Sequence, residues 1–549
     1  MKKRLEGLLQ HALVKAIEGG ALKSESLPPL IFERPKDQSF GDLASTVALA
    51  LARQERRAPR AIAEQIVRHL DDPNGILAAV DVADPGYINF RFAPRFWQQC
   101  LSEVERDDYG PAQFGAGRRV QVEFVSANPT GPLTIGHGRN AVLGDVIARL
   151  LEATGYRVTR EYYFNNAGKQ MTLLGESVKA RYLDLLGEGS RFPEGGYQGE
   201  YITAIADRLV AHHGSQLLGE PPAGIFKDEA EEAIFGDIKR TLARLGVRFD
   251  VYFNEDSLYA GGQIDATLAD LRARDLVCDR DGAVWLRSEP LGLDKDRVLK
   301  KASGEPAYRL PDIAYHQEKL GRGFDLIIDV LGADHIAEHK EVRAALRGLG
   351  CDVDKIKVVI HQFVTLTRGG AQVKMSTRRA EYVTVDELLD EVGSDVVRFF
   401  FLTRKADSHL EFDLDLAKKQ SADNPVFYVQ YAHARVCSLF RQAASAGVQR
   451  VAAAASHLDQ LQAPEELAVV KLLAQYTDTV EDAARALEPH RVVFYLIDLA
   501  SAFHRFYNRH RVVTAVAPQT AARLYLAWAV GRVIRSGLGL VGVSAPETM

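Results

Sequence analysis

A chain of 549 residues is too long for one hydrophobic core, and its 46 % hydrophobic and 26 % charged residues are those of an ordinary globular protein with about three to four domains. No apolar run reaches the roughly 18 residues of a membrane span and Met1-Lys-Lys-Arg-Leu-Glu lacks an apolar signal core, so we expect a cytoplasmic protein without membrane association and, by default, a monomer. The net charge of -5 argues against a general nucleic-acid binder, and the four cysteines are too widely separated for a disulfide framework or a structural zinc site.

The first 112 residues are predicted to form a small α/β domain. They alternate helical patterns with one short strand, Tyr87-Ile-Asn-Phe-Arg-Phe92, and contain no phosphate-binding loop. Within this domain, Ser39-Phe-Gly-Asp42 is expected to cap an apolar helix from Leu43 to Leu51.

Strands and helices alternate from Val120 onward. Strand patterns at 120–126, 157–164, 325–331 and 357–364, with a helix pattern at 136–153, predict a Rossmann-type parallel sheet covered by helices on both faces, in a domain of residues 113–385. Residues 168–250 are predicted to be a helical insertion. Ligands of such sheets bind beyond the carboxyl ends of the strands, at the switch between the two halves, where turns at Asn128 and Gly332-Ala-Asp334 are both expected to lie.

After Val385 the chain is expected to be helical. Residues 386–425 form a predicted junction, and residues 426–549 a predicted all-α bundle with helices at 452–461, 467–487, 491–505 and 521–538. The bundle segment has a small excess of Lys and Arg over Asp and Glu, which permits contact with RNA.

Two glycine-containing motifs carry the chemistry. Residues 122–139 pass from a β-branched strand through a Pro/Gly turn into a helix, whose unpaired N–H groups suit a phosphate, and Gly136 leaves room for an adenine ring. The second motif, Gly369-Gly-Ala-Gln-Val-Lys374-Met-Ser-Thr-Arg378, ends in cations suited to a leaving pyrophosphate. Taken singly, each of these cations is more often a surface residue.

Thr134-Ile-Gly-His137 resembles the HIGH signature of class I aminoacyl-tRNA synthetases, and Lys374-Met-Ser-Thr377 resembles their KMSK loop. Within that class, other segments are similar to arginyl-tRNA synthetases, namely residues 122–128, 162–168, 312–316 and 424–435. The resemblance implies an ATP-dependent ligase that forms arginyl-adenylate and transfers arginine to tRNA(Arg), with activation that requires bound tRNA.

The resemblance also implies the groups that handle ATP. The implied catalytic residues are Thr134, His137, Lys374, Ser376 and Arg378, and the implied ATP-binding residues are Ala127, Asn128, Pro129, Thr130, Gly131, Pro132, Leu133, Ile135, Gly136, Gly332, Asp334, His361 and Met375. Two positions depart from the family pattern: Thr134 stands where His is usual, and Thr377 where Lys is usual. ATP is expected as its Mg²⁺ complex, because no dedicated acidic cluster for the metal is visible.

The guanidinium of an arginine substrate has five hydrogen-bond donors and a positive charge, which carboxylate acceptors in the pocket must balance. Glu123 and Asp312 are the candidates, although Glu123 alone would equally fit an edge-strand charge and Asp312 a helix cap. Ile336-Ala337 departs from the family pattern near the pocket. The residues implied for arginine binding are Glu123, Ser126, Asn128, Tyr308, Asp312 and His335.

In the family the N-terminal domain binds the tRNA elbow and the C-terminal domain the anticodon loop. The implied contacts are Asn89, Phe92, Arg505, Arg509 and Arg511. Asn89 and Phe92 are equally explained as buried strand residues, and the aromatics of Phe503-His-Arg-Phe-Tyr-Asn-Arg-His-Arg511 as stacking platforms or as core. His361 and Phe363, at the end of a predicted strand, are candidates to flank adenine, although burial is the commoner explanation for an aromatic such as Phe363.

Two other functions are weighed against this one. A synthetase for cysteine is disfavoured by the lack of zinc-binding thiols, and one for an anionic amino acid by the acidic pocket residues. A non-catalytic tRNA-binding paralogue is favoured only by Thr134, whereas Asn128, Asp312 and Lys374 argue against it.

Overall fold

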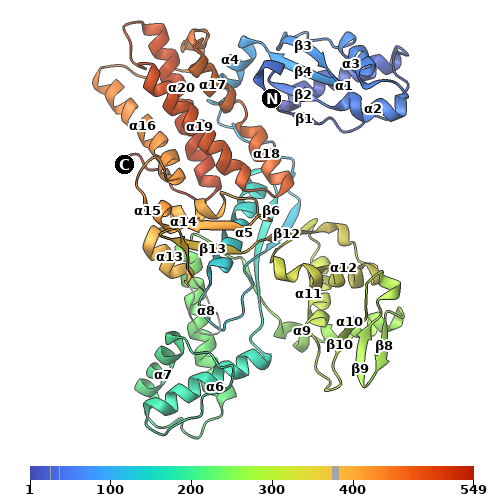
Figure 1. Ribbon diagram of the computed structural model, residues 1–549, viewed down its shortest axis with the longest axis vertical. Helices are drawn as coiled ribbons and strands as arrows, with labels where there is room; N and C mark the ends of the chain where they lie inside the picture. The colour runs from blue at the N-terminus through green and yellow to red at the C-terminus, as the bar shows by residue number, and fades with distance from the viewer. Residues whose placement is uncertain (25, 36, 374–382) are drawn as a thin grey trace.

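The N-terminal unit is an antiparallel sheet covered by helices, in a computed structural model that describes residues 1–549 except 25, 36 and 374–382 (Figure 1). Its four strands are arranged in the order β1-β2-β4-β3. The predicted strand at 87–92 is confirmed as β4. The elements are α1 (Lys2–Glu18), β1 (Phe32–Glu33), β2 (Leu43–Ser45), α2 (Val47–Glu55), α3 (Pro59–Arg68), β3 (Leu77–Ala83), β4 (Tyr87–Phe92) and α4 (Pro94–Glu103).

The predicted helix at Leu43–Leu51 is wrong in its first turn. Residues Leu43–Ser45 are the strand β2, because they pair with β4 and all three side chains are buried against the core. The helix α2 begins only at Val47. Tertiary pairing has therefore overridden the local helical pattern.

The central sheet has five parallel strands in the order β12-β11-β5-β6-β7, which confirms the Rossmann-type architecture. Strand β5 lies between β6 and β11, so the order of connection reverses at this point and a crevice is expected beyond the carboxyl ends of β5 and β11. The strands are β5 (Arg119–Glu123), β6 (Arg157–Phe164), β7 (Val251–Asn254), β11 (Leu326–Gly332) and β12 (Ile356–His361), and the helices beside them are α5 (Ile135–Ala153), α11 (Arg309–Gly321) and α12 (Ile336–Gly348).

Two strands end earlier than predicted. Strand β5 stops at Glu123, because Val125 and Ser126 adopt left-handed φ angles of 67° and 45°. Strand β12 stops at His361, and a separate strand, β13 (Val364–Arg368), follows it in another sheet.

Two substructures interrupt the parallel sheet. The insertion after β6 is helical as predicted, with α6 (Gly168–Leu185), α7 (Glu200–His213) and α8 (Lys227–Arg244). A second unit, not predicted, has an antiparallel sheet and shares with α11 and α12 a hydrophobic core that is separate from the main one. It contains α9 (Asp256–Ala260), α10 (Gln263–Ala273), β8 (Val277–Arg280), β9 (Ala283–Leu286) and β10 (Arg297–Lys300) and lies beside α11 and α12 (Figure 1).

The C-terminal part is a helical bundle. It contains α16 (Pro425–Ser445), α17 (Pro464–Leu473), α18 (Tyr476–Ala486), α19 (His490–Arg509) and α20 (Ala517–Leu540). Before it lie β14 (Ala371–Gln372), α13 (Val385–Val392), α14 (Ser394–Phe401), β15 (Leu410–Asp413) and α15 (Leu414–Lys418). In the described part of the chain, no helix is both long and apolar enough to cross a membrane.

Two helices predicted for the bundle differ from the structure. Residues 452–461 contain only short 3₁₀ turns, because the Ser456 hydroxyl bonds to the carbonyl oxygens of Val451 and Ala452 and His457 is left-handed with φ of 48°. The predicted helix 467–487 is two helices, α17 and α18, and the hydroxyl of Tyr476 at the start of α18 is 2.7 Å from that of Ser536.

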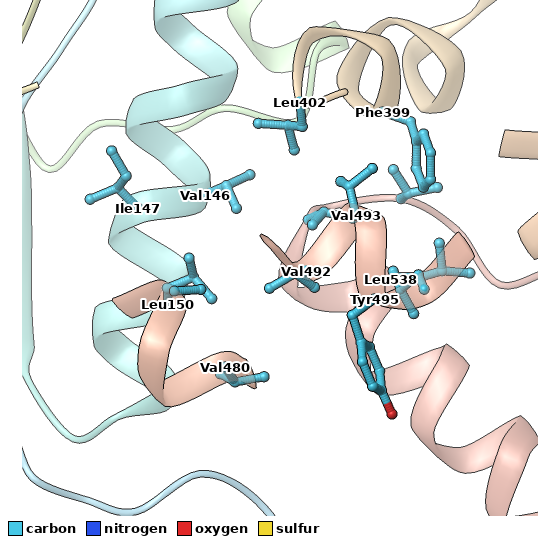
Figure 2. Packing of buried hydrophobic residues seen from close by; sticks show 14 of the residues in the cluster. Val146, Ile147, Leu150, Phe399, Leu402, Val480, Val492, Val493, Tyr495 and Leu538 are labelled. Carbon is cyan, nitrogen blue, oxygen red and sulfur yellow. The ribbon is translucent and has the colours of Figure 1, made fainter. Parts of the chain in front are cut away.

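The bundle packs directly on the helix α5 that follows the first motif. Val146 and Leu150 of α5 lie in one hydrophobic cluster with Val480 of α18 and Val492 of α19 (Figure 2). The buried Arg398 of α14 forms an ion pair with Asp145 of α5 and donates to the carbonyl oxygens of Leu245 and Val541, both at 2.9 Å. Helix α5 is therefore held by the bundle as well as by the sheet.

Candidate active site

Three strand ends meet at Asn140 of α5. Its Oδ1 accepts from the N–H of Val125 at 2.7 Å, and its Nδ2 donates to the Val330 carbonyl oxygen at 2.8 Å and lies 3.2 Å from Nε2 of His361. These residues belong to or follow β5, β11 and β12. The strands that lead into the two predicted turns are therefore joined at the switch point by a buried amide that was not singled out in the sequence.

The N-terminus of α5 presents a neutral imidazole. Nδ1 of His137 lies 3.2 Å from the backbone N–H of Thr134, which donates to it, so the ring proton is on Nε2. Burial lowers the pKa of His137, which keeps the ring uncharged. Thr134, which replaces the usual His of the signature, thus positions His137 through its backbone N–H, and its hydroxyl also lies 3.3 Å from Nδ1.

Gly136 is not required by packing inside the protein. A Cβ built there would come no nearer than 3.8 Å to any neighbour, the hydroxyl of Thr134. At Gly138, by contrast, a Cβ would lie 2.9 Å from a methyl group of Val385. The open space at Gly136 fits the prediction that an adenine ring approaches the backbone here.

The turn before α5 is fixed by hydrogen bonds to its neighbours. Asn128 accepts from the N–H of Asn165 at 3.0 Å and donates to Gln170 at 3.0 Å. The Tyr162 hydroxyl donates to the carbonyl oxygen of Ala127 at 2.7 Å, and the Tyr201 hydroxyl to that of Thr130 at 2.8 Å. The remaining predicted contacts, Pro129, Gly131, Pro132, Leu133 and Ile135, lie along the same turn, with the side chains of Leu133 and Ile135 buried in the core.

The loop after β11 lies across the crevice. Gly332 ends β11, and Asp334 and His335 follow in a short 3₁₀ turn, both exposed. The carboxylate of Glu338, 3.9 Å from Nδ1 of His335, raises the pKa of His335. The buried His361 has a pKa lowered to about 4 by desolvation, so it is neutral near pH 7.

Phe363 is not a core residue, which was the commoner explanation for it. Its side chain is 65 % exposed rather than buried. It lies two residues after the end of β12, beyond the carboxyl edge of the central sheet. A large exposed aromatic at the edge of a crevice is available to stack on a planar ligand.

The second motif falls mainly outside the described residues, and this includes Lys374, Met375, Ser376 and Arg378. The described segments on either side are anchored. Before it, Gly369 and Gly370 have φ of 59° and 73°, and the N–H of Gly369 donates to Asp415 at 2.5 Å. After it, Thr384 forms a β-bridge with Thr134. The chain therefore leaves the second motif next to the N-terminus of α5.

Two carboxylates without a cation lie in the pocket predicted for arginine. Asp312 is in the first turn of α11, and burial, followed by the nearby charges of Glu338, Glu255 and Glu123, raises its pKa to about 7 against the effect of His316. Glu255, directly after β7, is only 8 % exposed and accepts from the hydroxyls of Tyr163 at 2.5 Å and Tyr259 at 3.3 Å. Within the described ranges, neither carboxylate has a Lys or Arg partner.

Glu255 was missed in the sequence. The only signal for it is an acidic residue that closes the segment Val251-Tyr-Phe-Asn254, and this strand was not predicted. Tyr308, by contrast, was predicted and lies at the start of α11, where its side chain is 78 % exposed. Its ring is therefore free to cover a bound substrate.

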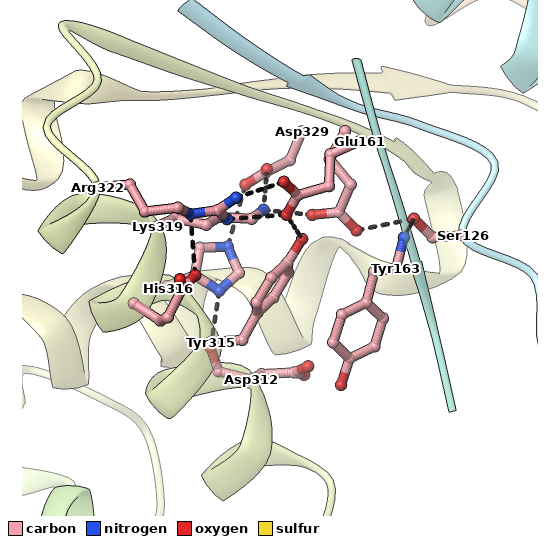
Figure 3. Close-up of polar contacts among 11 residues, drawn as sticks. Ser126, Glu161, Tyr163, Asp312, Tyr315, His316, Lys319, Arg322 and Asp329 are labelled. Carbon is pink, nitrogen blue, oxygen red and sulfur yellow. Dashed lines mark hydrogen bonds and ion pairs between the residues drawn. The ribbon is translucent and has the colours of Figure 1, made fainter. Parts of the chain in front are cut away.

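The predicted Glu123 already has a cationic partner within the protein, Lys319, which Figure 3 shows beside Asp329. The buried ammonium of Lys319 forms ion pairs with Glu123 and, at 2.8 Å, with Asp329. Ser126 donates from its hydroxyl to Glu123 at 2.9 Å and accepts from the N–H of Tyr163 at 3.2 Å. The role of Glu123 in meeting a guanidinium stays a prediction, and the structure places it behind the unpaired carboxylates as part of a buried ion network.

The predicted RNA contacts differ in exposure. Asn89 and Phe92 are buried, which is the alternative left open for them, and their contact with tRNA stays a prediction. In the bundle, Phe503 and Phe506 are also core residues. Arg505, Arg509 and Arg511 are exposed, and Arg509 forms an ion pair with Glu465.

Comparison with known proteins gives matches along nearly the whole chain. Family models match residues 3–92 (arginyl tRNA synthetase N terminal domain), 101–188 and 226–403 (tRNA synthetases class I (R), catalytic domain) and 429–549 (DALR anticodon binding domain). The arginine–tRNA ligase of Desulfotalea psychrophila is 50 % identical over 100 % of both chains, and that of Pelodictyon phaeoclathratiforme 49 % identical over 95 % of this chain and 96 % of its own. The fold is similar to that of the arginyl-tRNA synthetase of Thermus thermophilus, with a TM-score of 0.77 at 24 % identity over 98 % of this chain and 99 % of the other.

Proposed function

Because the chain belongs to the arginyl-tRNA synthetase family, we propose that its crevice holds arginine and ATP in line for the formation of arginyl-adenylate. The chain is an ATP-dependent ligase that joins arginine to tRNA(Arg). The observation that carries the proposed binding mode is the pair of unpaired acids, Asp312 and Glu255. The guanidinium of arginine, bound between them, would give each carboxylate a cationic hydrogen-bond donor.

In the first step the carboxylate of arginine attacks the α-phosphorus of ATP. A new O–P bond forms, and the bond from phosphorus to the bridging oxygen breaks, so that pyrophosphate leaves with its Mg²⁺. The Nε2–H of His137 and the first N–H groups of α5 donate to the phosphate oxygens, where negative charge grows in the transition state. Lys374, Ser376 and Arg378 are assigned to the departing pyrophosphate by their place in the second motif.

The remaining predicted contacts complete the site. Asp334 receives a ribose hydroxyl, and Phe363, exposed beside His361, stacks on adenine. Ser126 and Asn128 hold the amino and carboxyl ends of arginine. In the second step a hydroxyl of the terminal tRNA ribose attacks the carbonyl carbon of the adenylate, and AMP leaves.

The tRNA is assigned to the two outer domains. Residues 1–112 contact its elbow and residues 426–549 its anticodon loop, with the exposed Arg505 and Arg511 as candidates for the latter. We further propose that activation requires this contact. The packing of the bundle on α5 through Val480 and Val492 supports this proposal. A shift of the bundle on RNA binding would be transmitted to the helix that carries His137.

Arginine-dependent exchange of pyrophosphate into ATP tests the function and the tRNA requirement together. We expect exchange with arginine alone among the amino acids, and only when tRNA(Arg) is present. Exchange with arginine in the absence of tRNA would refute the requirement but not the ligase function. Binding of tRNA without exchange for any amino acid would favour the non-catalytic alternative.

The affinity for arginine should fall as the pH falls below about 7. The pKa of Asp312 in the free pocket is raised to about 7, so below this pH the carboxyl is mostly protonated and must lose its proton before it meets the guanidinium. The KM for arginine should therefore rise roughly tenfold per pH unit below pH 7 and level off above it. The same measurement on Asp312→Asn should give a KM without this slope, and a slope that persists there would assign it to another group.

A further inference from the structure

A second cluster of potential ligands lies behind the arginine pocket. His316 of α11, Asp329 of β11 and His339 of α12 each offer one nitrogen or oxygen atom, and these atoms all lie within 4.8 Å of one another. Nε2 of His316 is 3.1 Å from Oδ2 of Asp329. In the part of the chain that the structure describes, no other group of His, Cys, Asp and Glu has this property.

The outer contacts of two of these residues are those of metal ligands. Nδ1 of His316 lies 2.7 Å from the carbonyl oxygen of Asp312, so this nitrogen is the protonated donor and Nε2 presents a lone pair. The other oxygen of Asp329 accepts from the ammonium of Lys319 at 2.8 Å. Such outer hydrogen bonds orient the imidazole and carboxylate ligands of metal sites.

The inner contacts are incomplete without a cation. In its neutral form, the ring of His316 faces the carboxylate of Asp329 with a lone pair opposite a lone pair. Among the described residues, Nε2 of His339 has no hydrogen-bond partner. Water cannot supply one readily, because the residue is only 9 % exposed and this atom is buried. Buried polar atoms are almost always satisfied, so this orphan nitrogen points to an additional ligand.

The local charge and geometry admit a cation. The carboxylates of Glu123 and Asp329 share the single ammonium of Lys319, which leaves one negative charge. In a tetrahedral zinc site with bonds of about 2.0 to 2.2 Å, neighbouring ligand atoms lie roughly 3.3 to 3.6 Å apart. The 3.1 Å between Nε2 of His316 and Oδ2 of Asp329 is close to this spacing, and the third ligand atom lies within 4.8 Å of both. Two imidazoles and one carboxylate suit zinc and similar transition metals, whereas magnesium and calcium prefer oxygen ligands.

We propose that His316, Asp329 and His339 bind one Zn²⁺ or similar divalent transition-metal ion. The ion would join α11 to β11 and α12 and so fix the helix that carries Tyr308 and Asp312. The proposed ion touches none of the reacting atoms, and its three ligands are distinct from the residues predicted to bind arginine. The expectation of no structural zinc depended on the cysteines alone and did not consider these histidines.

Co²⁺ and Zn²⁺ titrations of the full-length, chelator-treated protein test the site. We expect one equivalent of Co²⁺ to give visible d–d bands without a thiolate charge-transfer band, and Zn²⁺ to displace it. Zn²⁺ should also raise the Tm. In His339→Ala the affinity should fall by at least about tenfold and the rise in Tm should disappear.

The matched control is Cys437→Ala, because the thiol of Cys437 lies 3.9 Å from Nδ1 of His433 and is the alternative soft site. This variant should bind Co²⁺ as the unaltered chain does. Unchanged binding in His339→Ala, a thiolate band lost in Cys437→Ala, or no stoichiometric binding to the unaltered chain would each overturn the proposal. The last result would mean that a proton lies between His316 and Asp329. If His339→Ala does not fold, the spectrum of the unaltered protein still decides between nitrogen and sulfur ligands.

Discussion

Replacing Asp312 with asparagine is expected to lower kcat/KM for arginine by about 30-fold to several thousand-fold. Truncating one partner of a desolvated charge pair costs about 2 to 5 kcal/mol, and each 1.4 kcal/mol is a factor of ten. Asparagine keeps the size of the side chain but removes the negative charge that would pair with the guanidinium. Its amide also adds N–H donors next to a guanidinium that has only donors and no acceptor. Arginine-dependent pyrophosphate exchange with saturating tRNA and ATP measures the effect.

Glu338→Gln is the matched control for this prediction. Glu338 also acts on Asp312 through its charge, but its own contact is with His335 at 3.9 Å. Neutralising it should change kcat/KM at pH 8 by no more than a few-fold, because Asp312 is already ionised there. Glu255→Gln should behave like Asp312→Asn. A loss of less than threefold in Asp312→Asn would show that the guanidinium binds elsewhere.

Replacing His137 with alanine is expected to lower kcat by about 100- to 1000-fold with little change in the KM for ATP. Removing one preorganised donor to a developing negative charge has this effect in other enzymes. The structure supplies the preorganisation, because the Thr134 N–H donates to Nδ1 and burial keeps the ring neutral, so the Nε2–H is available without rearrangement. Single-turnover formation of arginyl-adenylate with bound tRNA separates this step from product release.

Thr134→Ala provides the comparison. It removes the hydroxyl but retains the backbone N–H that orients His137, so its loss in kcat should be clearly smaller. A comparable loss in both variants would mean that the backbone N–H is not sufficient, and that the Thr134 hydroxyl, 3.3 Å from Nδ1, either orients the imidazole or itself contacts the phosphate. A rise in the KM for ATP at constant kcat in His137→Ala would mean that the imidazole binds ATP equally before and during the reaction.

Much of the catalytic fold was predictable because its signals are local. Residues 157–164 form a strand and residues 135–153 a helix, nearly as their patterns indicated. The two turns at Asn128 and Gly332 were expected at the same edge of the sheet, and the strands that precede them, β5 and β11, are parallel neighbours whose carboxyl ends share that edge. Prediction from the local pattern failed where a segment distant in the sequence determines the conformation. Leu43–Ser45, for example, form a strand because they pair with β4.

The sequence by itself determined the principal strands and helices of the nucleotide-binding core, the two nucleotide-binding motifs and the kinship to arginyl-tRNA synthetases. These depend on periodicity, turn residues and short motifs, which act over a few residues. Only the tertiary structure decided the charge state of the pocket. It paired Glu123 with Lys319, left Asp312 and Glu255 without a cation, and exposed Phe363. Burial and ion pairing depend on segments brought together by the fold, so no local pattern could assign them.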